Sequence, residues 1–156
     1  MKLSTMLDTV AKAIANNAGI EAYCQANFKR SISVYVHIDP KNPPSISKAP
    51  WVGLTVQAYR RPIANNANTL EFDLESAVFC SNANATESKE GNVTTLDGFE
   101  KLEDFSDLVF SVIESQVSTS PEQLNLTYND EQQTLLMISD FPGWISSRVW
   151  TVSKPI

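Results

Sequence analysis

Hydrophobic and polar residues alternate with a period of two over two neighbouring segments, residues 52–59 and 70–78. The apolar positions are Val52, Leu54, Val56, Ala58, Leu70, Phe72, Leu74 and Val78. Because successive side chains of a strand point to opposite faces, this pattern predicts a long β-hairpin with one apolar face that needs cover. The intervening residues 60–69 are polar and too numerous for a tight turn, so they are predicted to form a projecting loop.

Apolar residues recur with helical spacing near the N-terminus. They are Leu3, Leu7, Val10 and Ile14. This stripe predicts a short amphipathic helix, and the sequence Asn16-Asn17-Ala18-Gly19 predicts its end.

A second helical stripe lies in the middle of the chain. Its apolar residues are Phe99, Leu102, Phe105, Val109, Val112 and Ile113. They predict a helix over residues 99–117, and Asp97 and Glu100 have the spacing of a capping box at its start. Each such side chain stabilises the fold by roughly 1.5–3 kcal/mol when buried, before chain entropy is subtracted. This helix is therefore predicted to be the main cover of the sheet.

Further segments complete the predicted sheet. Strands are expected at residues 31–39, 124–128, 134–139 and 148–153, and residues 41–49 and 81–95 are expected to be exposed connections. The order is then helix, three strands, helix, three strands. This predicts a single α+β domain spanning residues 1–156, with an antiparallel or mixed sheet of about six strands covered by two helices.

Composition and charge narrow the functional classes. The chain has 156 residues, 42% of them apolar, with a net charge of -6 and a pI near 4.7. This acidic balance weighs against a surface that grips nucleic acid phosphates. No apolar run approaches the length of about 20 residues that spans a bilayer, so a cytosolic protein without a membrane partner is expected. Cys24 and Cys80 lack the spacing of a zinc site and are expected to be reduced, buried thiols.

The residues that are candidates for chemistry favour a protein without catalysis. His37 is the only histidine and lies on the outward side of a predicted strand, so an enzyme would need Cys24 or a serine beside it. Glu71, Asp73 and Glu75 share one face of a strand and are expected to face solvent or a partner; binding of a hard cation is the alternative. No catalytic residue, metal site or cofactor site is predicted.

Two groups of residues are candidates for protein contacts. Arg60 and Arg61, at one end of the projecting loop, are expected to face carboxylates such as Glu71, Asp73 and Glu75 of a neighbouring subunit. The aromatic residues of the second group lie around a Pro-Gly bend near the C-terminus; they are Phe141, Trp144 and Trp150. Aromatic side chains often anchor interfaces, so at least one is expected at a subunit contact. The alternative is that all three fill the core of the monomer.

The order of these elements resembles that of the tail terminator proteins of long-tailed bacteriophages, also called tail-to-head joining proteins, including the lambda-like type. The resemblance covers nearly the whole chain. It rests on a helix over Leu3–Ile14, strands over Ile32–Ile38, Trp51–Tyr59 and Leu70–Cys80, a helix over Phe99–Val117, and Gly143-Trp144-Ile145-Ser146-Ser147 before a last strand at Arg148–Val152. The chain departs from the family pattern in its longer 81–95 segment and in Ile145, which follows the tryptophan.

This resemblance implies an α+β fold and a structural virion protein without a catalytic site or cofactor. Such proteins form a hexameric ring that caps the tail tube, stops its polymerisation and joins it to the head. The implied partners are other copies of this chain, the tail tube protein and a head-side connector or stopper protein, while genomic DNA passes through the lumen without specific binding. The implied location is the tail or neck of the virion, with assembly in the host cytoplasm.

Three other functions stay open at this point. Another neck or head-completion protein would also form rings. A small cytosolic enzyme would use Cys24 or His37. A monomeric adaptor domain would neither form a ring nor catalyse a reaction.

Overall fold

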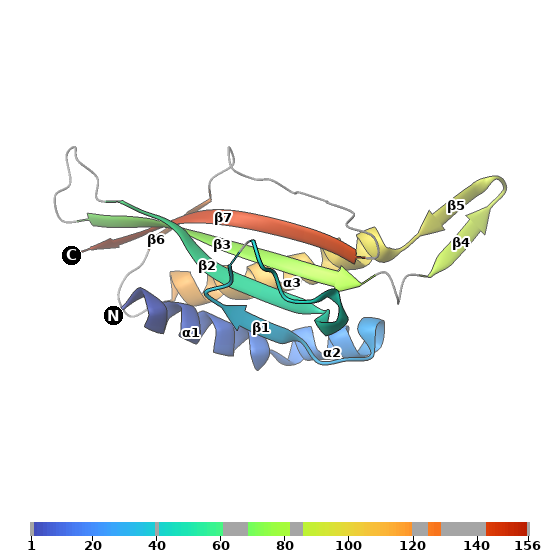
Figure 1. The fold of residues 1–156 in the computed structure, drawn as a ribbon, viewed down its shortest axis with the longest axis horizontal. Coiled ribbons are helices and arrows are strands. Elements are labelled where there is room, and N and C mark those ends of the chain that lie inside the picture. The colour runs from blue at the N-terminus through green and yellow to red at the C-terminus, as the bar shows by residue number, and fades with distance from the viewer. Residues whose placement is uncertain are drawn as a thin grey trace.

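The computed structural model describes residues 2–39, 41–60, 69–81, 86–119, 125–128 and 143–155. Its elements are α1 (Leu3–Ala15), α2 (Ala18–Phe28), β1 (Ser33–Val36), the 3-10 helix η1 (Ile46–Lys48), β2 (Trp51–Arg60), β3 (Thr69–Ser81), β4 (Glu87–Glu90), β5 (Val93–Leu96), α3 (Gly98–Ser118), β6 (Asn125–Tyr128) and β7 (Gly143–Pro155). The predicted α+β class is confirmed: helices cover one face of a mixed sheet (Figure 1).

The sheet has five described strands in the order β1-β2-β3-β7-β6, so β3 lies at its centre. The predicted hairpin forms as β2 and β3, with Val52 opposite Val78 and Val56 opposite Leu74. A bulge at Gln57 then shifts the register by one residue. Strand β1 pairs in parallel with β2, since the connection through η1 returns the chain to the same end of the sheet.

The main core lies between the sheet and the helices. Helix α3 packs on β3, β7 and β6, while α1 packs on β1, β2 and α3. The largest fully buried side chains in this core are Phe72, Phe105, Phe110, Trp150, Leu7, Ile14, Ile20, Leu54, Leu74, Leu102 and Ile113. Within the described residues no helix is long and apolar enough to cross a membrane.

A smaller core covers part of the opposite face of the sheet. Its buried members are Ala49, Trp51, Ala77 and Phe79, and the rings of Trp51 and Phe79 stack at 5.3 Å between centroids. Gly143 makes this packing possible, because a Cβ there would collide with the ring of Phe79. The sheet is therefore covered on both faces at this end.

The prediction of two helices missed α2. Asn17 was expected to end the first helix, and α1 does end at Ala15. The same Asn17 also caps the next helix, because its side-chain oxygen accepts a hydrogen bond from the Ile20 N–H at 3.0 Å. The buried residues of α2, Ile20, Cys24 and Phe28, recur every four positions, which was the available signal.

Two predictions for the second half are corrected, and a third is not tested. Residues 81–95 do not form only a loop, because β4 and β5 pair there as a second hairpin. The last strand is longer than 148–153, since β7 begins at Gly143. The predicted strand at 134–139 lies outside the described residues, so the expectation of about six strands in one sheet is compared only with the five described there.

The predicted capping box at Asp97 does not form. Its side chain makes no cap on α3. One carboxylate oxygen instead accepts the Thr86 backbone N–H at 2.5 Å, and the other lies 3.2 Å from the Lys101 ammonium. The hydrogen bond from Thr86 is the main cause that lowers the pKa of Asp97. Asp97 therefore joins the base of the second hairpin to the start of α3.

A buried polar contact fixes α3 against β7. The hydroxyls of Ser106 and Ser146 lie 2.6 Å apart and are 3% and 1% exposed. Replacing Ser106 with Ala leaves the Ser146 hydroxyl buried without this partner, so we expect a loss of about 1–3 kcal/mol in the free energy of unfolding. Urea denaturation of Ser106→Ala, Ser146→Ala and the double variant measures it. We expect the double variant to lose less than the sum of the two single losses.

Ser111→Ala, on the exposed face of the same helix, is the matched control and is expected to change stability little. Strictly additive losses from the two buried serines would show that they do not stabilise one another.

Candidate functional site

An acidic row lies on β3, on the sheet face opposite the helices. Its members Glu71, Asp73 and Glu75 alternate with Phe72 and Leu74, which are buried under the helices. Asp73 is only 3% exposed and accepts a hydrogen bond from the Thr151 hydroxyl at 3.0 Å. Burial raises the pKa of Glu75. The row is thus partly desolvated rather than fully exposed to water.

The acidic row supplies oxygen ligands, but the geometry does not arrange them for a metal. Among the described residues no group of three or more His, Cys, Asp or Glu side chains is placed to hold an ion. Asp73 directs its carboxylate to Thr151 in the neighbouring strand β7. Asp73 is therefore shielded from solvent and from a partner, contrary to the expectation for the row, whereas Glu71 and Glu75 are half-buried.

Of the two arginines predicted to make contacts from the loop, only Arg60 lies within the described residues. The backbone of Arg60 pairs with Glu71 at the end of the hairpin β2–β3 that leads into the connecting loop. Arg61 lies outside the described residues, as does the rest of the loop to residue 68. The expected contact between these arginines and a neighbouring subunit stays a prediction.

The three aromatic candidates do not form one surface. Trp150 is fully buried in the monomer, where its ring meets Phe110 at 5.4 Å in an edge arrangement. Trp144 is partly buried and lies 6.2 Å from Phe99. Phe141 lies outside the described residues. The side chain of Trp150 lies between the sheet and α3 and therefore makes no surface contact in this conformation. For Trp150, the alternative of a core position is correct.

The candidate enzyme residues lie in different environments. Cys24 and Cys80 are free and buried in the main core, as expected. Burial raises the pKa of the Cys24 thiol to about 12 and that of Cys80 well above its usual value, so neither forms a nucleophilic thiolate near neutral pH. His37 is exposed and has a left-handed backbone, with φ of 60°, just after β1. It therefore does not continue the strand as predicted.

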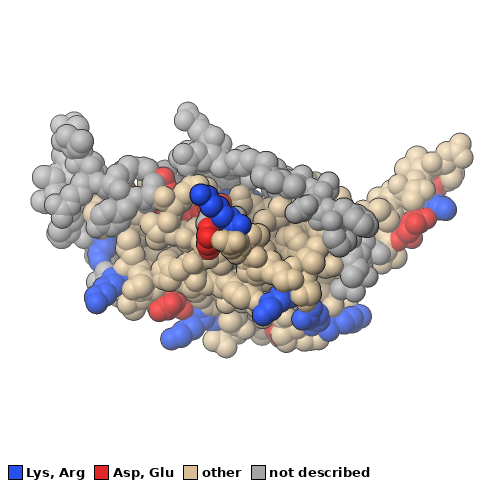
Figure 2. Space-filling model, in the orientation of Figure 1, with Lys and Arg blue, Asp and Glu red and all other residues tan. Residues whose placement is uncertain are grey.

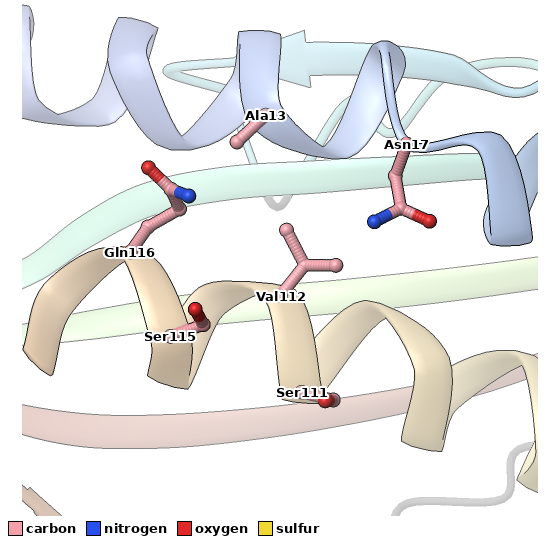
Figure 3. Close-up of a pocket in the computed structure, with 6 residues that line it drawn as sticks. All are labelled: Ala13, Asn17, Ser111, Val112, Ser115 and Gln116. Carbon is pink, nitrogen blue, oxygen red and sulfur yellow. The ribbon is translucent and has the colours of Figure 1, made fainter. Parts of the chain in front are cut away.

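A groove of about 240 Å³ lies between α1 and α3 (Figure 3). Its lining residues are Ala13, Asn17, Ser111, Val112, Ser115 and Gln116. Figure 3 shows Ala13, Asn17 and Val112 directed into the space between the helices. The lining contains no charged side chain, and the Asn17 oxygen already accepts the Ile20 N–H. The groove therefore supplies neither a nucleophile paired with a base nor a metal ligand set.

Sequence reasoning missed the feature that projects farthest from the body. The hairpin β4–β5 extends away from the layers of helices and sheet (Figure 1). All eight residues of its strands are exposed, and Val93 and Leu96 expose 63% and 54% of their surface. The alternation that predicts half-buried strands is absent because neither face of this hairpin packs on the core.

Charge is also distributed unevenly. Residues 1–61 contain eight Lys or Arg and three Asp or Glu, whereas residues 62–156 contain four and fifteen. The first part forms α1, α2, β1, η1 and β2, at one edge of the sheet, and much of the second part forms β3, the hairpin and α3. Figure 2 shows Lys and Arg side chains gathered along the lower edge of the molecule, where α1, α2 and β1 lie in Figure 1. A count along the sequence would have revealed this asymmetry.

Comparison with models of known protein families finds none that matches this chain, and a search of curated proteins finds no match either. The geometry and the sequence pattern are therefore the two sources from which function is inferred.

The raised pKa of Glu75 predicts a dependence of stability on pH. Because burial disfavours its charged form, Glu75 lowers stability above its folded pKa, and this penalty disappears below the usual value of 4.5. We expect Glu75→Gln to raise the melting temperature at neutral pH and to have a much smaller effect near pH 4. Thermal unfolding at both pH values measures this. Glu103→Gln, at an exposed position on α3, is the control. An equal increase in the melting temperature of Glu75→Gln at both pH values would contradict the prediction.

Trp144 and Trp150 differ in burial, so their truncation is expected to lower the stability of the protein by different amounts. Truncating a fully buried aromatic residue costs about 3–5 kcal/mol, so Trp150→Ala is expected to lower the free energy of unfolding by that amount. Trp144→Ala is expected to cost clearly less, because Trp144 is partly exposed. Chemical denaturation of both variants tests the order. A larger loss for Trp144→Ala would contradict the core position of Trp150.

Proposed function

We propose that this protein forms a ring that caps the tail tube of a long-tailed bacteriophage, ends tube polymerisation and joins the tail to the head connector. The observation that carries the proposal is the order of elements. Each regular segment on which the resemblance to tail terminator proteins rests has a counterpart in α1, β1, β2, β3, α3 and β7. The elements α2, η1, β6 and the hairpin β4–β5 are additional to the segments that carry the resemblance.

The distribution of charge supports assembly through unlike surfaces. A ring of identical subunits joined head to tail needs two different, complementary sides on each subunit. This chain has a basic side formed by its first 61 residues and an acidic remainder. Such charges steer association and fix register more than they add affinity.

A ring also explains how growth of a tube can end. A tube built from repeating heterologous contacts stops only when its tip is covered by a subunit that offers no copy of the same acceptor surface. A ring with two different faces meets this requirement, since one face binds the last tube subunits and the other binds the connector. A net charge of -6 suits a channel through which DNA passes without adhering.

Phage assembly without this protein tests the role directly. We expect tails of irregular, excess length that are not attached to filled heads, because nothing would cover the growing tip. Electron microscopy of tails from cells infected with a phage lacking the gene measures their length. Complementation with the intact gene is the control. Tails of normal length in its absence would contradict the terminator role and favour a head-completion protein.

The oligomeric state gives a second test. The chain has a mass of 17.3 kDa, and we expect the purified protein to contain rings of six subunits with an open centre. Mass measurement by light scattering and negative-stain images distinguish this ring from a monomeric adaptor or enzyme. A protein that stays monomeric over the accessible concentration range, alone and with tail tubes, would contradict the proposal.

A further inference from the structure

The hairpin β4–β5 has apolar surface that the monomer does not use. Two hydrogen bonds close the base of the hairpin: the Asp97 N–H donates to the Thr86 carbonyl oxygen at 3.2 Å, and the Asp97 carboxylate accepts the Thr86 N–H. The exposed side chains of Val93 and Leu96 lie beyond this base. A two-stranded hairpin alone is marginally stable in water, so cover by another surface would stabilise it.

The hairpin is also part of an acidic region. It carries Glu87 and Glu90, with Lys89 beside Glu87 at 3.3 Å. The start of α3, which follows it directly, adds the exposed carboxylates of Glu100 and Glu103. A complementary partner would therefore present cations next to a surface that accepts two apolar side chains.

This chain itself carries a group of exposed cations at the end of α2. Lys29 and Arg30 follow the helix, and the Arg30 guanidinium donates to the Ser47 carbonyl oxygen at 2.6 Å, which places it beside Lys48 of η1. All three cationic residues, Lys29, Arg30 and Lys48, are exposed, and we call them the basic corner. The neighbouring strand β1 is an edge of the described sheet, so among the described strands it pairs on one side only.

The two surfaces lie at opposite sides of the same end of the molecule. In Figure 1 the hairpin rises at the upper right, whereas α2 and β1 lie along the lower side. Lys and Arg side chains gather at the lower right in Figure 2. A contact between the hairpin of one copy and the basic corner of the next would therefore join two different surfaces, as a head-to-tail ring requires.

We propose that the hairpin β4–β5 docks on the basic corner of the next copy of this chain. The contact places Val93 and Leu96 against the neighbour beside β1, with Glu87 and Glu90 facing Lys29 and Lys48. This inference rests on the proposed ring, because it names the contact that joins adjacent subunits. An acidic hairpin is unsuited to anionic membranes or nucleic acid, whereas the exposed Lys29 and Lys48 of another copy are complementary to its charge.

Charge reversal tests the pairing. We expect Glu87→Lys with Glu90→Lys to raise the concentration needed for assembly at least tenfold, and Lys29→Glu with Lys48→Glu to do the same. Combining all four substitutions restores opposite charges across each contact and is expected to recover assembly. Analytical ultracentrifugation at low and high salt measures the effect, which should shrink as salt screens the charges. Asp8→Lys, an exposed reversal on α1 that keeps the basic side basic, is the matched control and should assemble normally.

The apolar part is tested separately. Val93→Thr with Leu96→Thr removes apolar surface but keeps good strand formers, so we expect weaker assembly with an unchanged circular dichroism spectrum. Circular dichroism of each charge variant likewise verifies that the monomer is folded.

The outcomes separate the hairpin contact from the proposed function. Rings that form equally well with every hairpin variant would overturn the contact and leave the ring intact. Loss of assembly without recovery in the fourfold variant would overturn the basic corner as the acceptor. A wild-type protein that never forms rings would overturn the proposed function and this contact together.

Discussion

Burial of one face of strand β3 under helix α3 is the packing on which the rest of the structure depends. The strand is the centre of the described sheet, and Phe72, Leu74 and Val78 turn toward the helices. Phe105, Val109 and Ile113 meet them from α3. This contact joins residues that are far apart in the sequence. The strands β2 and β7 pair with the two sides of β3, and α1 packs against α3.

The opposite face of the sheet serves a different purpose. One end is closed by the small cluster around Trp51 and Phe79, and farther along β3 lie the carboxylates of Asp73 and Glu75. Partial burial raises the pKa of Glu75, a cost that the core on the other face can offset. The two faces of β3 therefore differ: one contributes apolar side chains to the main core, and the other holds carboxylates in a partly desolvated position.

The described residues supply little of the chemistry that the enzyme alternative needs, and they give the molecule two unlike sides. The buried thiols of Cys24 and Cys80 and the isolated, exposed His37 do not form a nucleophile with its base. By contrast, the protruding hairpin and the unequal charge of the two parts of the chain give a subunit with different sides. Unlike sides are what a closed ring of identical subunits requires.

The sequence by itself determined the elements whose apolar residues are periodic. Helices α1 and α3 and the hairpin β2–β3 could be predicted because burial on one face leaves a repeat of 3.6 or 2 residues. Tertiary structure decided the features without such a repeat. Asn17 starts a second helix because its side chain accepts a hydrogen bond from the Ile20 N–H. Asp97 does not cap α3, because its carboxylate instead accepts the Thr86 N–H at the base of the hairpin. Trp150 belongs to the core because β7 pairs with β3 in the register that places it under α3, and residue type alone does not distinguish a core aromatic from an interface aromatic.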